Sequence, residues 1–135
     1  MYAEGMTNTA KQLRLVLETE DLEGALAFYR DGLGWHVDVD HAVDGGVRIV
    51  QVTPPGSGCS IGFGTGLDLY QGTPVRGVHL VVADAHAARA ELVGRGVDVT
   101  DVTDVGGGVL MASFADPDGN GFLLQEMPWR SGDAF

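Results

Sequence analysis

The stretch DLEGALAFYRDGLG, residues 21–34, carries one apolar side chain per helical turn. Its large apolar residues recur at steps of four, three and four, which places them on one face of a helix; they are Leu22, Leu26, Tyr29 and Leu33. Asp21 stands where its carboxylate can accept hydrogen bonds from the free amides of the first turn, and glycines at the far end supply a stop. The stretch predicts a capped helix that packs one face against a core.

A second stretch repeats this pattern later in the chain. Shifting the sequence by 63 places moves Asp21 onto Asp84 and Tyr29 onto Leu92. The helix predicted after Asp84 spans residues 85–95. Its apolar stripe is narrower and consists of Ala85, Ala88 and Leu92. The two helices therefore belong to two copies of one structural unit.

Runs of β-branched and alternating residues predict eight short strands around these helices. The strands span residues 13–19, 35–39, 47–52, 60–63, 78–82, 97–102, 109–114 and 122–127. A shift of 62 superposes later strands of the two halves, for example Val47 on Val109 and Val52 on Phe114. The order strand, helix, three strands thus occurs twice. The predicted fold class is α+β, with two βαβββ modules.

The modules have predicted boundaries and connections. The sequence divides into a flexible N-terminal arm, a first module, a linker, a second module and a C-terminal tail; these span residues 1–11, 12–66, 67–75, 76–128 and 129–135. Glycine pairs and triplets at residues 45–46 and 106–108 are interpreted as hairpin turns inside the modules.

Charge and composition exclude several classes of partner. The 135 residues include 19 acidic and 8 basic ones, for a formal net charge of −11, and such a field repels nucleic acid and anionic membranes. With 44% apolar residues a packed core is expected, yet no run approaches the ~20 apolar residues of a membrane span. Cys59 is the only cysteine, which excludes an intrachain disulfide and fits a cytoplasmic location.

Three motifs resemble the glyoxalase, bleomycin-resistance and extradiol-dioxygenase group, also called the vicinal oxygen chelate (VOC) superfamily. They are LEGALAFYRDGLG at residues 22–34, ARAELVGRG at residues 88–96 and FADPDGN at residues 114–120. The resemblance covers about residues 12–128 and implies a glyoxalase-like fold, in which the two modules form a curled mixed sheet around a ligand cup. It also implies a homodimer. Aspartate, proline, glycine and asparagine are typical residues of tight turns, so the aspartates of the last motif are interpreted as structural.

Alternation along the first strand of each module assigns side chains to the cup or to the core. Leu13, Leu15 and Leu17 are expected to pack beneath the first helix, with the intervening side chains facing the cup; these are Arg14, Val16 and Glu18. In the second module Val78, Leu80 and Val82 are expected to pack likewise, so that His79 and Val81 face the cup.

Metal-using relatives of this kind take ligands from the first and last strands of each module. Carried over by spacing, those positions hold Arg14, Gly77 and Leu123, with Ile61 as the repeat equivalent of Leu123. None of these side chains can ligate a divalent ion. We therefore expect no metal and no cofactor. A shifted site that uses His79 with Gln125 or Glu126 remains an alternative, although Glu126 has the wrong strand parity.

The resemblance and these substitutions favour a metal-free protein that binds an antibiotic-like or metabolic small molecule. The expected cup is mostly apolar, with a few polar groups that orient the ligand. The predicted ligand-binding residues are Arg14, Val16, Glu18, Trp35, Ile61, Phe63, His79, Val81, Leu123 and Gln125. Trp35 is expected at the rim.

Two other function classes remain open from the sequence. One is an enzyme of the same superfamily, a lyase, isomerase or dioxygenase, either metal-independent or with the shifted metal site. In a metal-independent enzyme the catalytic acid and base would be His79 and Glu18. The other class is a regulatory module that binds only protein and has no deep pocket.

Overall fold

The structure, a computed structural model, describes residues 12–65 and 74–130, without the side chain of Glu18. The predicted N-terminal arm, most of the linker and most of the C-terminal tail lie outside these residues. The elements in chain order are β1 (Leu13–Glu18), α1 (Leu22–Ala27), η1 (Phe28–Gly32), β2 (His36–Val43), β3 (Val47–Thr53), β4 (Cys59–Thr65), β5 (Val78–Val81), α2 (Ala85–Gly94), β6 (Thr103–Asp104), β7 (Leu110–Ala115) and β8 (Gly121–Glu126).

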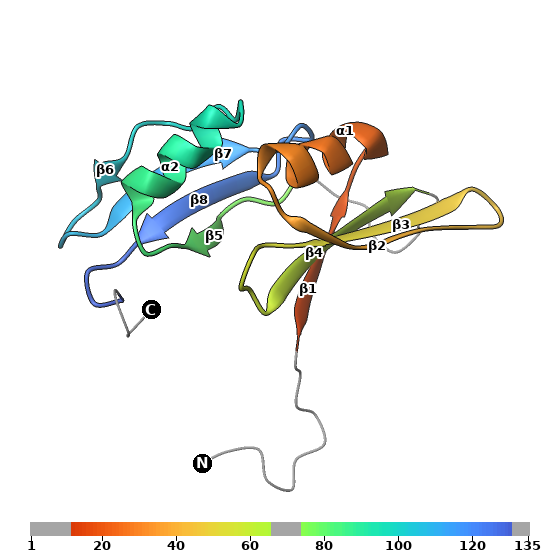
Figure 1. The fold of residues 1–135 in the computed structure, drawn as a ribbon, viewed down its shortest axis with the longest axis horizontal. Helices are drawn as coiled ribbons and strands as arrows, with labels where there is room; N and C mark the ends of the chain where they lie inside the picture. The colour runs from red at the N-terminus through yellow and green to blue at the C-terminus, as the bar shows by residue number, and fades with distance from the viewer. Residues whose placement is uncertain (1–11, 66–73, 131–135) are drawn as a thin grey trace, which may run out of the picture.

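The strands form two four-stranded sheets with the same topology (Figure 1). The strand orders are β1-β4-β3-β2 and β5-β8-β7-β6. In each sheet the first and last strands of the module pair in parallel, and the remaining pairs are antiparallel. The prediction of an α+β fold with two βαβββ modules is confirmed. The two sheets remain separate and do not close into one barrel.

Each helix begins at the predicted aspartate cap. The Asp21 carboxylate accepts a hydrogen bond of 3.1 Å from the Gly24 amide, and the Asp84 carboxylate accepts one of 3.0 Å from the Ala87 amide. The single helix predicted from the stretch at residues 21–34 changes from α1 to the wider π-turn η1 at Phe28. Tyr29 lies in that turn and is buried.

The strand predicted at residues 97–102 is the main difference from the expected elements. Within the described residues, the edge strand β6 is only two residues long and lies at Thr103–Asp104. Val97 and Val99 are buried, which accounts for the alternating pattern, but their segment is a loop. The Thr100 amide still donates to the Ser113 carbonyl at 2.9 Å, so this loop follows β7 as a poorly paired edge.

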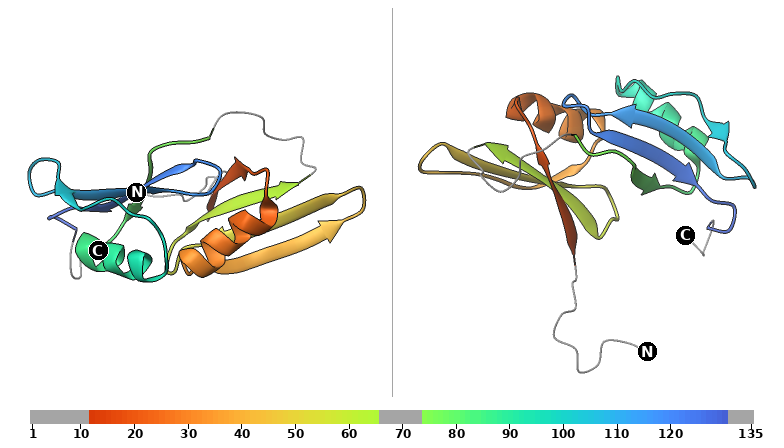
Figure 2. Two further views of the ribbon diagram at one scale, coloured as in Figure 1. Left: turned by 90° about the horizontal axis from the view of Figure 1, so that it is seen from above. Right: turned by 180° about the vertical axis from the view of Figure 1, so that it is seen from behind.

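One apolar core spans both modules. α1 lies along the first sheet next to the second, as the two views in Figure 2 show. The Tyr29 ring lies 5.5 Å from Phe63 of the first sheet and 6.1 Å from Phe122 of the second, measured between ring centroids. Trp35 packs against Tyr29 and Phe122. The modules are thus two halves of one folding unit.

A buried hydrogen-bond network ties the FADPDGN turn to this core. The Asp116 carboxylate accepts the Tyr29 hydroxyl at 2.5 Å, and it also accepts the Asn120 side-chain amide at 2.8 Å. The backbone amides of Asp118 and Asn120 donate to the same carboxylate. With four donors around it, Asp116 has a structural role, as the turn chemistry suggested.

The apolar face of β1 is only partly covered. Leu17 is buried, but Leu15 is 42% exposed and Leu13 is 64% exposed. The expectation that all three leucines pack beneath the first helix is therefore wrong for Leu13 and Leu15. The short α1 begins beyond the end of β1 and lies over only one end of that strand, whereas the other end extends away from the molecule (Figure 1).

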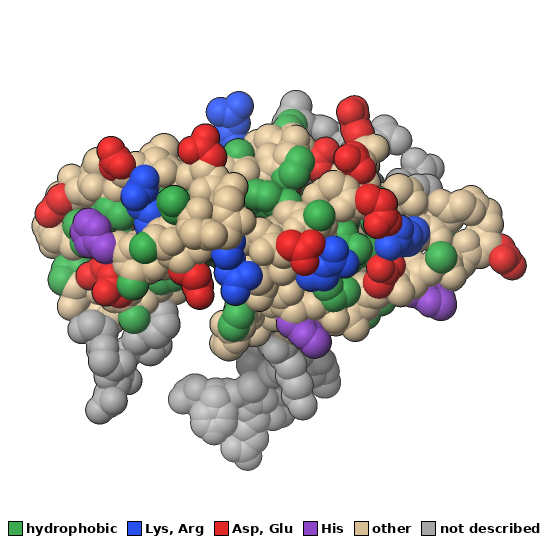
Figure 3. Space-filling view, turned by 45° about the horizontal axis from the view of Figure 1, so that its top comes forward, with side chains coloured by type: hydrophobic (Ala, Val, Ile, Leu, Met, Phe, Trp, Pro, Cys, Tyr) green, Lys and Arg blue, Asp and Glu red, His purple; other side chains and the backbone are tan. Residues whose placement is uncertain are grey.

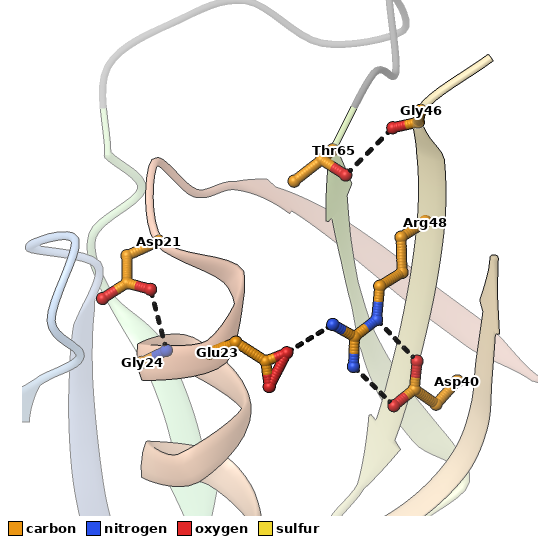
Figure 4. Close-up of polar contacts among 7 residues, drawn as sticks. All are labelled: Asp21, Glu23, Gly24, Asp40, Gly46, Arg48 and Thr65. Carbon is orange, nitrogen blue, oxygen red and sulfur yellow. Dashed lines mark hydrogen bonds and ion pairs between the residues drawn. The ribbon is translucent and has the colours of Figure 1, made fainter.

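Charged side chains are distributed over the outer surface of the helices and sheets. Figure 3 shows acidic side chains interspersed with the fewer basic ones on one face. On the first module, Arg48 of β3 pairs with Asp40 of β2 and with Glu23 of α1 (Figure 4). The Asp40 contact is bidentate, with both distances between 2.8 and 2.9 Å. In the described residues no helix could cross a membrane.

Candidate functional site

Each sheet has one face toward the core and one face away from it, which we call its open face. On the first sheet, Arg14 and Val16 of β1 lie beside Ser60 and Gly62 of β4 on the open face. Gln51 of β3 joins them opposite Gly62 and is 7% exposed. Arg14 and Val16 have the placement expected from alternation; Glu18 shares their strand face, but its side chain is outside the described part.

Polar side chains continue across the first open face toward β2. Asp38 accepts hydrogen bonds from the Gln51 amide at 3.3 Å and from the Thr53 hydroxyl. His36 lies 3.8 Å from the same carboxylate. A register shift between Val37 and Val39 turns Asp38 toward this face. The side-chain nitrogen of Gln51 thus gives one of its two hydrogens to Asp38, which leaves the second hydrogen as a donor and the carbonyl oxygen as an acceptor.

The second open face combines apolar and polar groups. His79 and Val81 of β5 pair in register with Leu123 and Gln125 of β8. The His79 Nδ1 atom lies 2.7 Å from the Gly77 carbonyl, which can only accept a hydrogen bond. Nδ1 therefore carries a proton, and Nε2 is the free acceptor of the neutral ring. This geometry allows His79 to accept a hydrogen bond from a ligand.

A hollow of about 660 Å³ lies at the turn end of the second open face. Leu123 and Ser113 contribute to its floor, and Thr100, Asp98 and Arg76 border it. The hydroxyls of Thr100 and Ser113 lie 3.3 Å apart, and Thr100 also accepts the Ser113 amide. The lining of the hollow thus combines apolar side chains with hydroxyl and charged groups.

A second cavity, a groove of about 660 Å³, separates the modules on their core side. Its lining is largely apolar. It includes Leu13, Leu15 and Leu80, and it also includes the predicted ligand-binding residues Trp35, Ile61, His79 and Val81. The exposed leucines of β1 therefore border a space between the sheets and do not lie on the open face.

Three predicted ligand-binding residues belong to the core. Ile61 and Phe63 pair in register with Leu15 and Leu17, on the opposite face of the sheet from Arg14, and they are 5% and 2% exposed. Trp35 is 6% exposed and packs in the aromatic core. The repeat alignment predicts Ile61 and Phe63 on the other face because it is one residue out of register in the last strands. Trp35 and Ile61 border the groove between the modules, and a ligand-binding role for these residues stays a prediction.

The correct repeat partner of Leu123 is Gly62. Leu123 pairs with His79, as Gly62 pairs with Val16, and both pairs lie on open faces. The corrected register does not restore a metal site, because glycine has no side-chain donor. The positions that hold metal ligands in related proteins are then Arg14, Gly62, Gly77 and Leu123, a set that does not fit a divalent ion.

The alternative of a shifted metal site also loses one of its ligands. Glu126 pairs with Leu110, on the face opposite His79, and its carboxylate accepts the Ala85 amide at 2.8 Å. Glu126 therefore caps the start of α2. Among the described residues there is no group of three His, Cys, Asp or Glu side chains that could hold a metal.

The predicted residues occupy both open faces and the groove between the modules. The groove is bordered by Trp35, Ile61, His79 and Val81 of one chain. Arg14 and Val16 lie on the first sheet; His79, Val81, Leu123 and Gln125 lie on the second. The residues missed by the sequence analysis come from middle strands, and they include Gln51, Ser60, Met111 and Ser113. Alternation with the buried Val50, Val52, Ala112 and Phe114 is the signal that would have found most of them.

Comparisons with known proteins agree with this architecture. The family model described as "Glyoxalase/Bleomycin resistance protein/Dioxygenase superfamily" matches residues 11–124. None of the curated proteins compared matches the chain. A glyoxalase/bleomycin resistance protein from Streptomyces sp. CB03234 is 30% identical, with 84% of this chain and 97% of that chain covered and a TM-score of 0.69.

Two further solved structures extend the likeness. A superfamily member from Sphaerobacter thermophilus DSM 20745 is 30% identical, with coverage of 88% and 98% and a TM-score of 0.73. TnmS3, an antibiotic binding protein from Streptomyces sp. CB03234, is 27% identical, with coverage of 89% and 98% and a TM-score of 0.72. The chain belongs to the glyoxalase/bleomycin resistance protein/dioxygenase superfamily.

Proposed function

We propose that this protein binds an antibiotic-like or metabolic small molecule and does so without a metal ion. The observation that carries the proposal is the content of the open faces at the positions of the family's metal ligands. Those positions hold an arginine, two glycines and a leucine, which cannot ligate a metal. Around them remain apolar side chains with a few polar ones, which is the composition of a small-molecule site.

The similarity to TnmS3 supports a ligand of antibiotic type. Its fold matches along most of both chains, and the hollow on the second open face provides a place for an apolar group.

The exposed Cys59 thiol is compatible with a reducing compartment, so we place the protein in the cytoplasm.

We further propose that the working form is a homodimer in which a second copy completes the cup. β1 and β5 are edge strands with one unpaired side each, and both carry exposed apolar residues, such as Leu15 and Val81. Within one chain, Arg14 and Val16 lie on the open face of one sheet, and Leu123 and Gln125 lie on the open face of the other. A second copy that covers these edges would bring an open face of each chain around one ligand.

Ligand binding can be tested by melting-temperature shifts with a panel of antibiotics and aromatic metabolites. A compound at a hundredfold excess over its Kd should stabilise the native protein by about 2.7 kcal/mol. Leu123→Asp, which places a charge in the hollow, should abolish the shift, and Val93→Asp on exposed α2 is the matched control. The enzyme alternative would be favoured if no compound of the panel shifts the melting temperature and if one of the compounds is converted to product when iron, manganese, nickel or zinc is added.

The homodimer can be tested by sedimentation at tens of micromolar. We expect a dimer for the wild type and a monomer for Leu15→Asp, because the charge would lie in the proposed apolar contact. Val93→Asp should remain dimeric. A wild type that sediments as a monomer would contradict the homodimer but would leave ligand binding to be judged by the melting-temperature experiment.

A further inference from the structure

The pairing of the arginine side chains sets Arg14 and Arg76 apart. With 19 acidic residues against 8 basic ones, each arginine has many carboxylates available to it. Four other arginines donate to carboxylates or carbonyls, namely Arg30, Arg48, Arg89 and Arg95. Within the described part of the chain, Arg14 and Arg76 have no hydrogen bond or ion pair. Both border an open face, where they are free to bind an external anion.

The Arg14 side chain extends from the edge strand β1 toward the neighbouring strand β4. Its Cδ atom lies 3.4 Å from the place where a side chain on Gly62 would begin. The glycine therefore makes room for the arginine stem to cross β4. The side chain remains exposed, so its guanidinium group can be reached from solvent.

Ser60 lies beside Arg14 and has an unused hydroxyl. The two residues are partners in the parallel register of β1 and β4, so their side chains share the open face. Ser60 is 2% exposed, and its Oγ is the only buried side-chain polar atom in the described residues without a hydrogen-bond partner. A buried hydroxyl without a partner is unfavourable, and a ligand acceptor would satisfy it.

Arg76 has a less suitable environment for an anion. The hollow that it borders also contains the Asp98 carboxylate, which repels a negative group. Arg14 has the uncharged Ser60 as its register partner. The Asp38 carboxylate on the same face already accepts hydrogen bonds from Gln51 and Thr53. Arg14 is therefore the better anion-binding residue of the two.

We propose that the bound small molecule carries an acidic group, a carboxylate or a comparable oxyanion, which Arg14 binds with Ser60 as a second donor. This inference rests on the proposed function. A guanidinium can give a carboxylate two parallel hydrogen bonds, and charge-assisted bonds of this kind are about twice as strong as neutral ones. Because Ser60 is buried, the ligand can reach its hydroxyl only if a neighbouring side chain moves aside. Arg14 is exposed and can make this movement.

The net charge of −11 does not prevent this recognition. It repels an acid from a distance, but at physiological salt its effect is screened beyond about 8 Å. At contact distance the guanidinium group dominates. The acidic chain should therefore slow the arrival of the ligand, and Arg14 should slow its departure.

The test uses three matched pairs of aromatic probes with full-length protein: benzoate, naphthoate and anthraquinone carboxylate, each against its carboxamide. Calorimetric titration measures the affinity of each probe. The acid of at least one pair should bind about tenfold more tightly than its amide. Arg14→Gln should abolish this preference, whereas Arg30→Gln, which removes an equal charge from an arginine paired with Asp31, should leave it intact.

Ser60→Ala adds an independent measurement. The substitution removes a buried, unpartnered hydroxyl, so the melting temperature without probe should stay constant or rise, while the preference for the acid falls. If acids and amides bind equally well, or if the preference survives Arg14→Gln, this inference is wrong and the proposed binding function stands. If no probe and no compound of the antibiotic panel binds, the proposed function fails as well.

Discussion

At the scale of single residues, Tyr29 shows how one side chain can serve two modules. Its ring fills the core between the sheets, and its hydroxyl donates to the buried Asp116 carboxylate 87 positions away. Burial and the neighbouring carboxylate raise the pKa of Tyr29 well above its usual value, so the phenol remains a hydrogen-bond donor. The apolar stripe identified Tyr29 as a core residue, but periodicity carries no information about a partner in the other module.

Tyr29→Phe should destabilise the protein although it preserves the ring. Without the hydroxyl, the buried Asp116 carboxylate loses one of its four donors, and the expected loss is about 1 to 3 kcal/mol in the free energy of unfolding. Urea denaturation at neutral pH measures this loss. An unchanged free energy of unfolding would show that the three remaining donors suffice for Asp116.

A second prediction at this scale concerns Asp40 and acid. The hydrogen bonds from the Arg48 guanidinium lower the pKa of Asp40 below its ordinary value. The stability that this pair contributes is present above the unfolded pKa of about 3.9 and is lost as the pH falls through the lower folded value. Both side chains are partly exposed, at 31% for Arg48 and 35% for Asp40, so solvent screening should keep the contribution small.

Melting temperatures between neutral pH and about pH 3 should show this effect. Asp40→Asn should have a lower melting temperature than the wild type at neutral pH. The difference between the two melting temperatures should become smaller as the pH falls. Asp44→Asn, in the hairpin turn, removes an equal charge and serves as the control. A constant difference between Asp40→Asn and the wild type across the pH range would contradict the prediction.

At the scale of elements, strand alternation predicts the face of a side chain where the residue types on the two faces of the strand differ. It placed Arg14 and Val16 on the face away from the core, and it did the same for His79 and Val81. For β4 the repeat alignment of Ile61 with Leu123 predicts Ile61 and Phe63 on the cup face. The pairing with Leu15 and Leu17 instead places both on the core face.

The same elements predict different responses from two leucines of β1. Leu17 is 3% exposed and packs in the core, so Leu17→Ala should cost about 2 to 5 kcal/mol through loss of burial and formation of a cavity. Leu15 is 42% exposed and borders the groove, so Leu15→Ala should cost clearly less in the monomer. Denaturation at concentrations below dimer formation compares them. Equal costs would mean that the exposed part of β1 is covered in the folded monomer.

At the scale of the whole molecule, the internal repeat predicted both modules but not their relation to each other. The repeat follows from two capped helices and regular strand spacing, which are local features of the sequence. The separation of the sheets, and with it the distance between Arg14 and His79 in one chain, depends on contacts such as Tyr29 with Phe122. Such contacts arise from the shapes of side chains in three dimensions, and no spacing in the sequence encodes them.

The shared core predicts that the two modules unfold together. Phe122 of the second module stacks on Phe114 and contacts Tyr29 and Trp35 of the first, so the first module packs against it directly. Phe122→Ala should cost about 3 to 5 kcal/mol and should lower the stability of both modules by the same amount. Hydrogen exchange of β3 and β4 amides reports on the first module, and that of α2 and β8 amides reports on the second. Coincident transitions are expected in the wild type and in Phe122→Ala, because neither sheet can cover its apolar face alone. A first module that keeps its transition while the second unfolds earlier would show that each βαβββ unit is stable by itself.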